Sequence, residues 1–211
     1  MSTWDELLKR EEFQQWEPAW AVIRFAKLLR ERDLRRILDL GCGAGRHLVF
    51  LAREGFEAFG LDSSPVAPEL SRGRLEEEGL KAELVQANMT EIPYPDGFFD
   101  GVIAIAAVYH GTLSEMRQAV REIHRVLKPG GWALIEIKSK RSYRYGKGRE
   151  IEPDTFIAEG GGDAGIPHHY SDREEVEELT KEFILHEINH MERIFEGEYH
   201  SARWEVWLEK P

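Results

Sequence analysis

Residues 37 to 45 read Ile-Leu-Asp-Leu-Gly-Cys-Gly-Ala-Gly, an apolar run with one acidic residue that leads into three alternating glycines. An apolar run of this length predicts a buried strand, and the glycines predict a sharp turn after it. Without a Cβ, Gly41, Gly43 and Gly45 permit positive φ angles and let a bulky ligand lie against the backbone. Asp39 adds a carboxylate just before the turn. A close-fitting turn with a negative charge favours a cationic ligand over a pyrophosphate.

The sequence beyond this turn alternates between strand and helix patterns. Apolar runs predict strands over 36–40, 57–61, 82–86, 99–106 and 132–137. Most of the segments between them have helical periodicity; Ser64 followed by Pro65 marks one helix start, and a helix over 114–127 stops at Lys128-Pro129-Gly130-Gly131. Such alternation predicts parallel strands joined by right-handed crossovers, with helices on both faces of the sheet.

The two ends of the chain depart from this pattern. Thr3 and Glu6 have the spacing of a capping box, and a second helix is predicted over Trp16–Arg32. Residues 139–170 are rich in glycine and show no strong period, which predicts an irregular segment, either a lid or disordered. Ser171 and Glu174 form a further capping box before a short helix. The apolar-rich segments at 183–195 and 199–208 then predict an antiparallel hairpin at the far edge of the sheet.

Composition limits the classes of partner. The formal net charge of -11, from 28 basic and 39 acidic residues, argues against a general binder of nucleic acid or anionic membrane. Cys42 is the only cysteine, so we expect no intrachain disulfide and a reducing compartment. No apolar stretch reaches the roughly 18 residues that indicate a membrane span. We therefore expect a cytoplasmic protein without membrane or nucleic-acid partners, and leave open whether it is a monomer or a homodimer.

Informative side chains follow four of the predicted strands. In an open parallel sheet, ligands bind beyond the carboxyl ends of the strands, so these residues are expected to meet. The second strand ends at Asp62 and Ser63, and Asp62 can accept hydrogen bonds from both hydroxyls of a ribose. Asn88 and Met89 follow the third strand and suit the edge and face of an adenine. The fourth runs through small residues, beginning at Ala104, that leave room for a ligand, and is followed by Tyr109 and His110.

Taken in order, the segments LDLGCGAG, GLD, QANM, PDGFFDGVIA and HRVLKPGG resemble the class I S-adenosylmethionine-dependent methyltransferases, in particular the broad small-molecule group, over residues 35–138. The resemblance implies a Rossmann-like three-layer α/β sandwich with a seven-stranded, mostly parallel sheet whose last strand is antiparallel. It also implies that Asp39 and the glycines line the methionine portion of the cofactor, that Asp62 holds the ribose and that Asn88 and Met89 flank the adenine. Many relatives have Asp in place of Asn88.

The predicted cofactor site comprises Asp39, Gly41, Cys42, Gly43, Gly45, Asp62, Ser63, Asn88, Met89 and Ala104. No metal site is predicted. We divide a single domain, 1–211, into a helical cap (1–34), a cofactor-binding core (35–138), an irregular loop on the substrate side (139–170) and a C-terminal helix and hairpin (171–211).

Two other functions are compatible with parts of this pattern. A nicotinamide-dependent oxidoreductase also uses a glycine-rich turn and a ribose-binding acid, although the spacing here is GxGxG and Asp39 would repel a pyrophosphate. A protein that binds S-adenosylmethionine without catalysis is the other alternative. The leading hypothesis is transfer of the cofactor's methyl group to a small-molecule acceptor by direct displacement, which releases S-adenosylhomocysteine.

The acceptor side is less defined by the sequence. Tyr109, His110, His168 and His169 are the candidate catalytic residues, needed as bases only if the acceptor must lose a proton. The N-terminal aromatic residues form either a cap over the cofactor or helix packing on the sheet; they are Trp4, Phe13, Trp16 and Trp20. The basic stretch over 138–149 either guides an anionic substrate or an RNA, or is a solvated loop.

Overall fold

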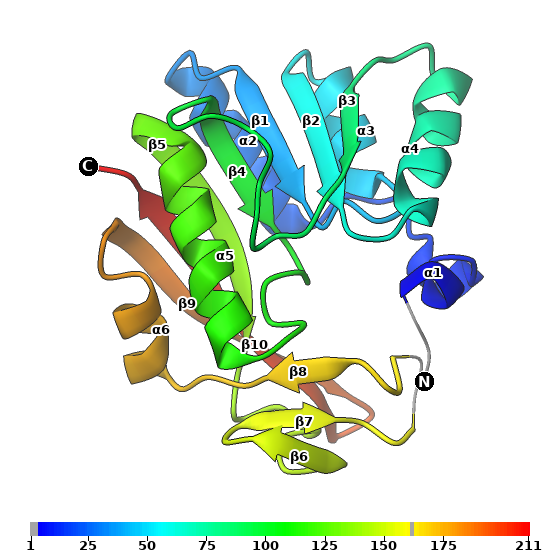
Figure 1. The fold of residues 1–211 in the computed structure, drawn as a ribbon, viewed down its shortest axis with the longest axis vertical. Coiled ribbons are helices and arrows are strands. Elements are labelled where there is room, and N and C mark those ends of the chain that lie inside the picture. The colour runs from blue at the N-terminus through cyan, green and yellow to red at the C-terminus, as the bar shows by residue number, and fades with distance from the viewer. Residues whose placement is uncertain (1–3, 161–162) are drawn as a thin grey trace.

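Seven strands form one sheet in the order β3-β2-β1-β4-β5-β10-β9, in a computed structural model that describes residues 4–160 and 163–211 (Figure 1). The bounds are β1 Arg36–Leu40, β2 Glu57–Asp62, β3 Glu83–Gln86, β4 Phe99–Ala104, β5 Leu127–Lys138, β9 Ile184–Phe195 and β10 Glu198–Glu209. The first five run parallel, and β10 is antiparallel to both of its neighbours. The predicted fold class is confirmed, including the hairpin at the edge of the sheet.

Helices cover both faces of this sheet (Figure 1). They are α1 Trp4–Leu7, the short 3₁₀ helix η1 Glu11–Phe13, α2 Trp20–Glu31, α3 Arg46–Arg53, α4 Val66–Glu77, α5 Leu113–Val126 and α6 Arg173–Leu179. Because neighbouring strand residues point to opposite faces, β1 contributes to two cores. Leu38 belongs to the core that includes Met116 of α5, and Ile37 belongs to the core that includes Phe25 of α2. No helix in the described part of the chain is long and apolar enough to span a bilayer.

The order of the strands creates the crevice that a ligand needs. The chain runs outward from β1 through β2 to β3, and then crosses back to place β4 on the other side of β1. The loops after β1 and β4 therefore leave the sheet in opposite directions, which opens a space beyond the carboxyl ends of these two strands.

The segment predicted as irregular over 139–170 contains a second, three-stranded antiparallel sheet. Its strands are β6 Arg149–Glu152, β7 Thr155–Ile157 and β8 Pro167–His169, in the order β6-β7-β8. The prediction was wrong for these stretches because strands of three or four residues are too short to show a period of two in the sequence. This small sheet lies beside the core, where the His169 N–H donates to the Tyr109 carbonyl at 2.9 Å.

Two helices begin at other residues than predicted. The helix predicted from Trp16 begins at Trp20, since Pro18 disfavours a helical conformation at the residue before it and Ala19 is extended. The cap of α6 is Asp172, whose side chain accepts from the Glu175 N–H, instead of Ser171 with Glu174. Ser171 is held in a bridge with Ser139. The predicted cap at Thr3 lies outside the described residues.

Candidate active site

A cavity of about 470 Å³ lies at the carboxyl ends of the strands. The loops after the first four strands and the N-terminal segment line most of it, and each contributes a small number of residues. After β1 come Gly41, Cys42, Gly43 and Ala44; after β2, Asp62 and Ser63; after β3, Asn88 and Met89; after β4, Ile105, Ala106, Ala107, Tyr109 and His110; and from the N-terminal segment, Trp4, Leu8 and Phe13. The fold therefore brings together nine of the residues that the sequence predicts for the site.

The glycine turn shapes one wall of the cavity. Gly41 and Gly43 have φ angles of 75° and 53°, which other residues rarely adopt. A Cβ on Gly41 would lie 2.6 Å from the Cβ of Ala107, whereas a Cβ on Gly43 would meet only Leu8 Cδ2, at 3.4 Å. The free space beside Gly43 is therefore on the cavity side, where a ligand can approach the backbone.

Asp62 holds the turn as well as facing the cavity. Its Oδ2 accepts from the Gly43 N–H and its Oδ1 from the Ser64 N–H, both at 2.9 Å. Burial raises the pKa of this carboxyl group, and the two backbone donors oppose that shift. Each oxygen retains a lone pair for a further donor, such as a ribose hydroxyl.

Three predicted cofactor residues, Asp39, Gly45 and Ala104, do not line the cavity. Asp39 lies behind the turn, 1% exposed, and its Oδ2 has no hydrogen-bond partner among the described residues. Burial raises the pKa of Asp39 to about 7, although nearby Arg46 opposes the shift. Gly45 caps α3, and Ala104 is fully buried, so that the next residues, Ile105 and Ala106, reach the cavity instead.

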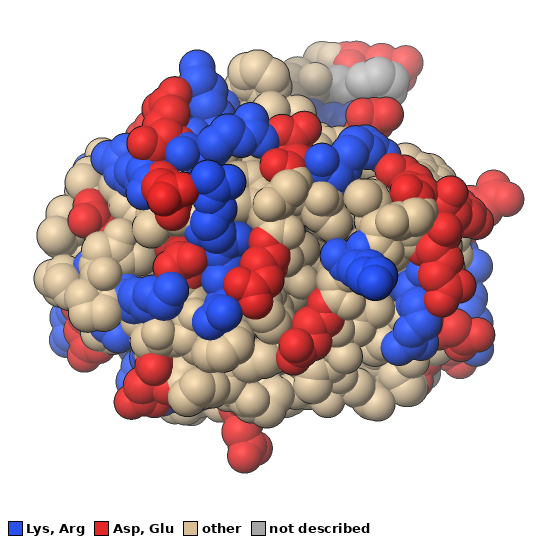
Figure 2. Space-filling view, turned by 90° about the horizontal axis from the view of Figure 1, so that it is seen from above, with Lys and Arg blue, Asp and Glu red and all other residues tan. Residues whose placement is uncertain are grey.

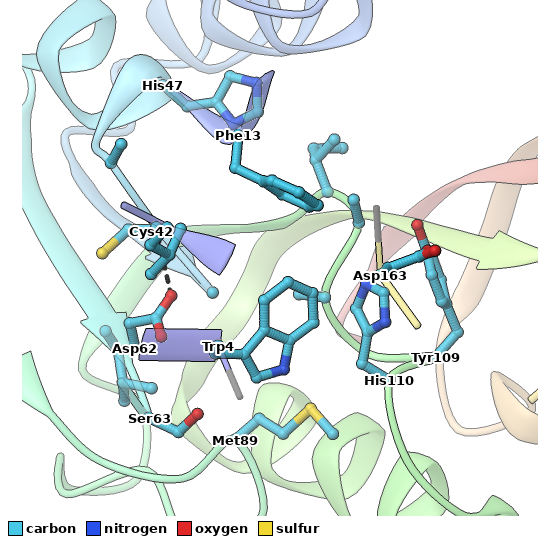
Figure 3. Close-up of a pocket in the computed structure, with 18 of the residues that line it drawn as sticks. Trp4, Phe13, Cys42, His47, Asp62, Ser63, Met89, Tyr109, His110 and Asp163 are labelled. Atoms are coloured by element: carbon cyan, nitrogen blue, oxygen red, sulfur yellow. Dashed lines mark hydrogen bonds between the residues drawn. The ribbon is translucent and has the colours of Figure 1, made fainter. Parts of the chain in front are cut away.

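Aromatic rings line the side of the cavity nearest the N-terminus (Figure 3). The ring of Trp4 meets His110 edge to face, with centroids 4.7 Å apart, and Phe13 lies 6.5 Å from Trp4 in the same manner. Trp16 and Trp20 neither cap the cavity nor pack on the sheet, because their exposed fractions are 54% and 73%. The first short helices therefore contribute to the cavity, whereas α2 packs on the sheet.

The four candidate catalytic residues separate into two pairs. Tyr109 and His110 line the cavity, and burial raises the pKa of the Tyr109 phenol and lowers that of His110 well below its usual range. His168 and His169 do not line it. Both ring nitrogens of His169 are taken, by Thr155 Oγ1 at 2.7 Å and Glu175 Oε2 at 2.9 Å. His168 lies between the Ile166 carbonyl at 3.0 Å and Asp163 Oδ2 at 3.1 Å.

Seven polar residues of the cavity were absent from the predicted site: Glu12, Gln15, Arg46, His47, Glu115, Lys138 and Asp163. Lys138 ends β5, so the rule that selected the other strand ends also selects it, but the basic residues after it made it look like part of a loop. His47 is 4% exposed and accepts from the Ala19 N–H at 3.3 Å; burial lowers its pKa to about 3. No sequence pattern distinguishes Asp163.

Known proteins resemble this chain over the same core. The family profile described as "Methyltransferase domain" matches residues 37–131. An uncharacterised methyltransferase of Synechocystis is 36% identical over 104 residues, which is 49% of this chain and 47% of that protein. The chain spans about half the length of the first curated relatives that it matches.

Solved structures share the fold. A SAM-dependent methyltransferase of Methanosarcina mazei superposes with a TM-score of 0.74 at 23% identity, covering 86% of this chain and 96% of that one. The 1,6-didemethyltoxoflavin-N1-methyltransferase of Burkholderia thailandensis, solved with its substrate and S-adenosylhomocysteine, gives a TM-score of 0.63 at 17% identity, over 90% and 78% of the two chains. The profile match identifies residues 37–131 as a methyltransferase domain, and the fold and the cavity at the glycine turn agree with a class I S-adenosylmethionine-dependent methyltransferase.

Proposed function

We propose that this protein transfers the methyl group of S-adenosylmethionine to a small-molecule acceptor by direct displacement. The observation that carries the proposal is the cavity itself, in which a backbone open to close approach at Gly43 lies beside the carboxylate of Asp62. S-adenosylmethionine supplies an activated methyl group when bound, so the protein's main contribution is to orient the reactants and to exclude water.

The residues of the cavity fit this cofactor. Asp62 and Ser63 offer acceptors to the ribose, Asn88 and Met89 an amide and a soft apolar side chain to the adenine, and the turn at Gly41–Gly45 the space for the methionine portion. Arg46 follows the turn directly, and its guanidinium pairs with no carboxylate within 4.0 Å among the described residues, so it can receive the cofactor's carboxylate. The closed edge-to-face contact of Trp4 with His110 favours exclusion of water.

The acceptor is proposed to bind beside Tyr109 and His110. Where the acceptor must lose a proton, His110 is the proposed base, because it lines the cavity and its buried Nδ1 has no hydrogen-bond partner among the described residues. His168 and His169 are proposed to support the site from behind, since both bind other protein groups.

A small molecule is a better acceptor than a nucleic acid on the grounds of charge. The chain carries a net charge of -11, and on the face shown in Figure 2 basic and acidic side chains are interspersed, without a broad basic region. We further propose a cytoplasmic location, on the ground that the single cysteine, Cys42, is a buried free thiol.

The proposal is tested by Asp62→Ala and Asp62→Asn. The alanine variant removes both backbone contacts and the ribose acceptors, so we expect S-adenosylhomocysteine to bind about 1–3 kcal/mol more weakly in calorimetry. Asn keeps one acceptor oxygen and is expected to lose less. Exposed Asp96, in an ion pair with Arg125 at 2.9 Å, provides the control, and its Asn variant is expected to bind as wild type does. Unchanged affinity in both Asp62 variants would remove this residue from the cofactor site.

A further inference from the structure

Lys138 places a positive charge on the cavity wall without a negative partner. It is the last residue of β5, is only partly exposed, and lines the cavity. Its ammonium lies 5.3 Å from the centre of the Tyr109 ring. Among the described residues, no carboxylate oxygen comes within 4.0 Å of Lys138 Nζ and no hydrogen bond reaches it. This cation–π contact offsets part of the hydration that the ammonium loses, but it leaves the N–H donors of Lys138 without an acceptor among the described residues.

The nearest carboxylates are already occupied by other cations. Asp163 pairs with Arg144 and lies 3.1 Å from His168 Nε2. Glu136 pairs with Arg203, its two oxygens lying 3.1 and 3.3 Å from Arg203 Nη1. Burial lowers the pKa of Lys138; Arg203 and Arg144 act in the same direction, and Asp163 and Glu136 oppose it. This part of the wall therefore has an excess of positive charge.

The Tyr109 ring that the ammonium faces carries a second hydrogen-bond donor, its hydroxyl group. The Tyr109 side chain is 5% exposed, and its hydroxyl makes no hydrogen bond within the described part of the chain. Together, Lys138 and Tyr109 offer a charged donor and a neutral donor from two neighbouring strand ends. Such a pair suits an oxyanion, which accepts hydrogen bonds from both.

We infer that Lys138 and Tyr109 bind an oxyanion of the methyl acceptor, a carboxylate or a phosphate, at the end of the cavity away from Asp62. The inference rests on the proposed methyltransferase function and names its substrate class. Figure 3 shows Asp62 and Ser63 on one side of the cavity and Tyr109, His110 and Asp163 on the other, with Trp4 between them. The cofactor's own carboxylate has Arg46 beside the turn, which leaves the Lys138 wall to the acceptor.

Four variants test the inference. Lys138→Met removes the charge and keeps the length of the side chain, Lys138→Arg keeps the charge, and Tyr109→Phe removes only the hydroxyl. Exposed Lys147, in the same basic stretch, provides the control as Lys147→Met. Because the ammonium of Lys138 has no carboxylate partner, Lys138→Met is expected to unfold at a temperature no lower than wild type.

The first measurement tests whether Lys138 binds the carboxylate of the cofactor or an oxyanion of the acceptor. Calorimetry with S-adenosylhomocysteine and with 5′-methylthioadenosine, which lacks the amino-acid part, is expected to give affinities within about twofold of wild type for all four variants. If Lys138→Met loses affinity for S-adenosylhomocysteine alone, Lys138 binds the cofactor's carboxylate and the inference is wrong. If wild type fails to bind S-adenosylhomocysteine, the proposed function fails first.

The second measurement identifies the charge of the acceptor. A metabolite extract is incubated with methyl-labelled S-adenosylmethionine, before and after the substrates that an anion exchanger retains have been removed. Transfer is expected only with the retained substrates, and kcat/KM for them is expected to fall about 10- to 100-fold in Lys138→Met. Lys138→Arg and Tyr109→Phe are expected to fall less, and Lys147→Met to match wild type. Transfer to unretained substrates at an undiminished rate in Lys138→Met would overturn the inference, whereas no transfer to any fraction would overturn catalysis itself.

Discussion

At the scale of a single residue, Gly43 has two roles: it adopts a positive φ angle in the turn, and its lack of a side chain leaves space in the cavity. Gly43→Ala imposes a φ near 53° on an alanine and puts a methyl group into the cavity. We expect a stability loss of about 1–2 kcal/mol in urea unfolding and at least a tenfold loss of affinity for S-adenosylhomocysteine in calorimetry.

Gly79 is the matched control for this change. Its φ is 66°, and a Cβ there would meet nothing within 4 Å. Gly79→Ala carries the same backbone cost, so it is expected to lose similar stability and to keep its affinity. Equal affinities in the two alanine variants would show that the cavity does not extend to Gly43 in solution.

Asp39 predicts a pH dependence of stability. Burial raises its pKa in the folded protein to about 7, from an ordinary value of 3.8. Between these two values the unfolded chain has released the proton and the native protein has kept it, so Asp39 destabilises the fold increasingly as pH rises and reaches its full effect above about pH 7. Asp39→Asn is therefore expected to gain stability over wild type from pH 4 to pH 8, by about 1–3 kcal/mol in urea unfolding. A difference that stays constant across this range would contradict the raised pKa.

At the scale of an element, His169 ties the small sheet β6-β7-β8 to α6. Its ring binds Thr155 of β7 and Glu175 of α6. His169→Ala removes both contacts; Thr155 Oγ1 keeps its hydrogen bond to Glu152 Oε1 at 3.1 Å, whereas Glu175 Oε2 loses its imidazole partner. We therefore expect a loss of about 1–3 kcal/mol in unfolding and faster hydrogen exchange over 149–169. His186→Ala breaks an exposed contact with Glu209 and is expected to cost about 1 kcal/mol or less. Faster exchange across the whole chain in His169→Ala would show that the small sheet does not open by itself.

The lengths and ends of the strands determine which parts of the structure could be predicted from the sequence. The run at 36–40 is long and apolar enough to identify β1, and the rule of strand ends correctly located Asp62, Asn88, Tyr109 and His110 at one cavity. His168, which was selected for its place before a capped helix, does not line the cavity, because its ring faces Asp163 in a contact set by tertiary packing. Lys138 was missed because β5 ends where a basic stretch begins.

At the scale of the whole molecule, ligand binding is expected to stabilise the entire fold. The cavity draws residues from four strand ends and from the N-terminal segment, so a ligand there is contacted only in the folded state. At 100 times its Kd, such a ligand adds about 2.7 kcal/mol, which for a chain of this size corresponds to a rise in Tm of about 5–10 °C.

Thermal unfolding with two cofactors therefore distinguishes the candidate functions in one measurement. S-adenosylhomocysteine is expected to raise Tm by this amount and NAD to leave it unchanged, because the glycine spacing GxGxG at 41–45 differs from the GxGxxG of pyrophosphate-binding turns. Gly43→Ala provides the internal control, since a loss of affinity of at least tenfold is expected to reduce the shift to about half or less at the same ligand concentration. A rise in Tm with NAD and none with S-adenosylhomocysteine would assign the turn to a nicotinamide cofactor, despite the spacing of its glycines.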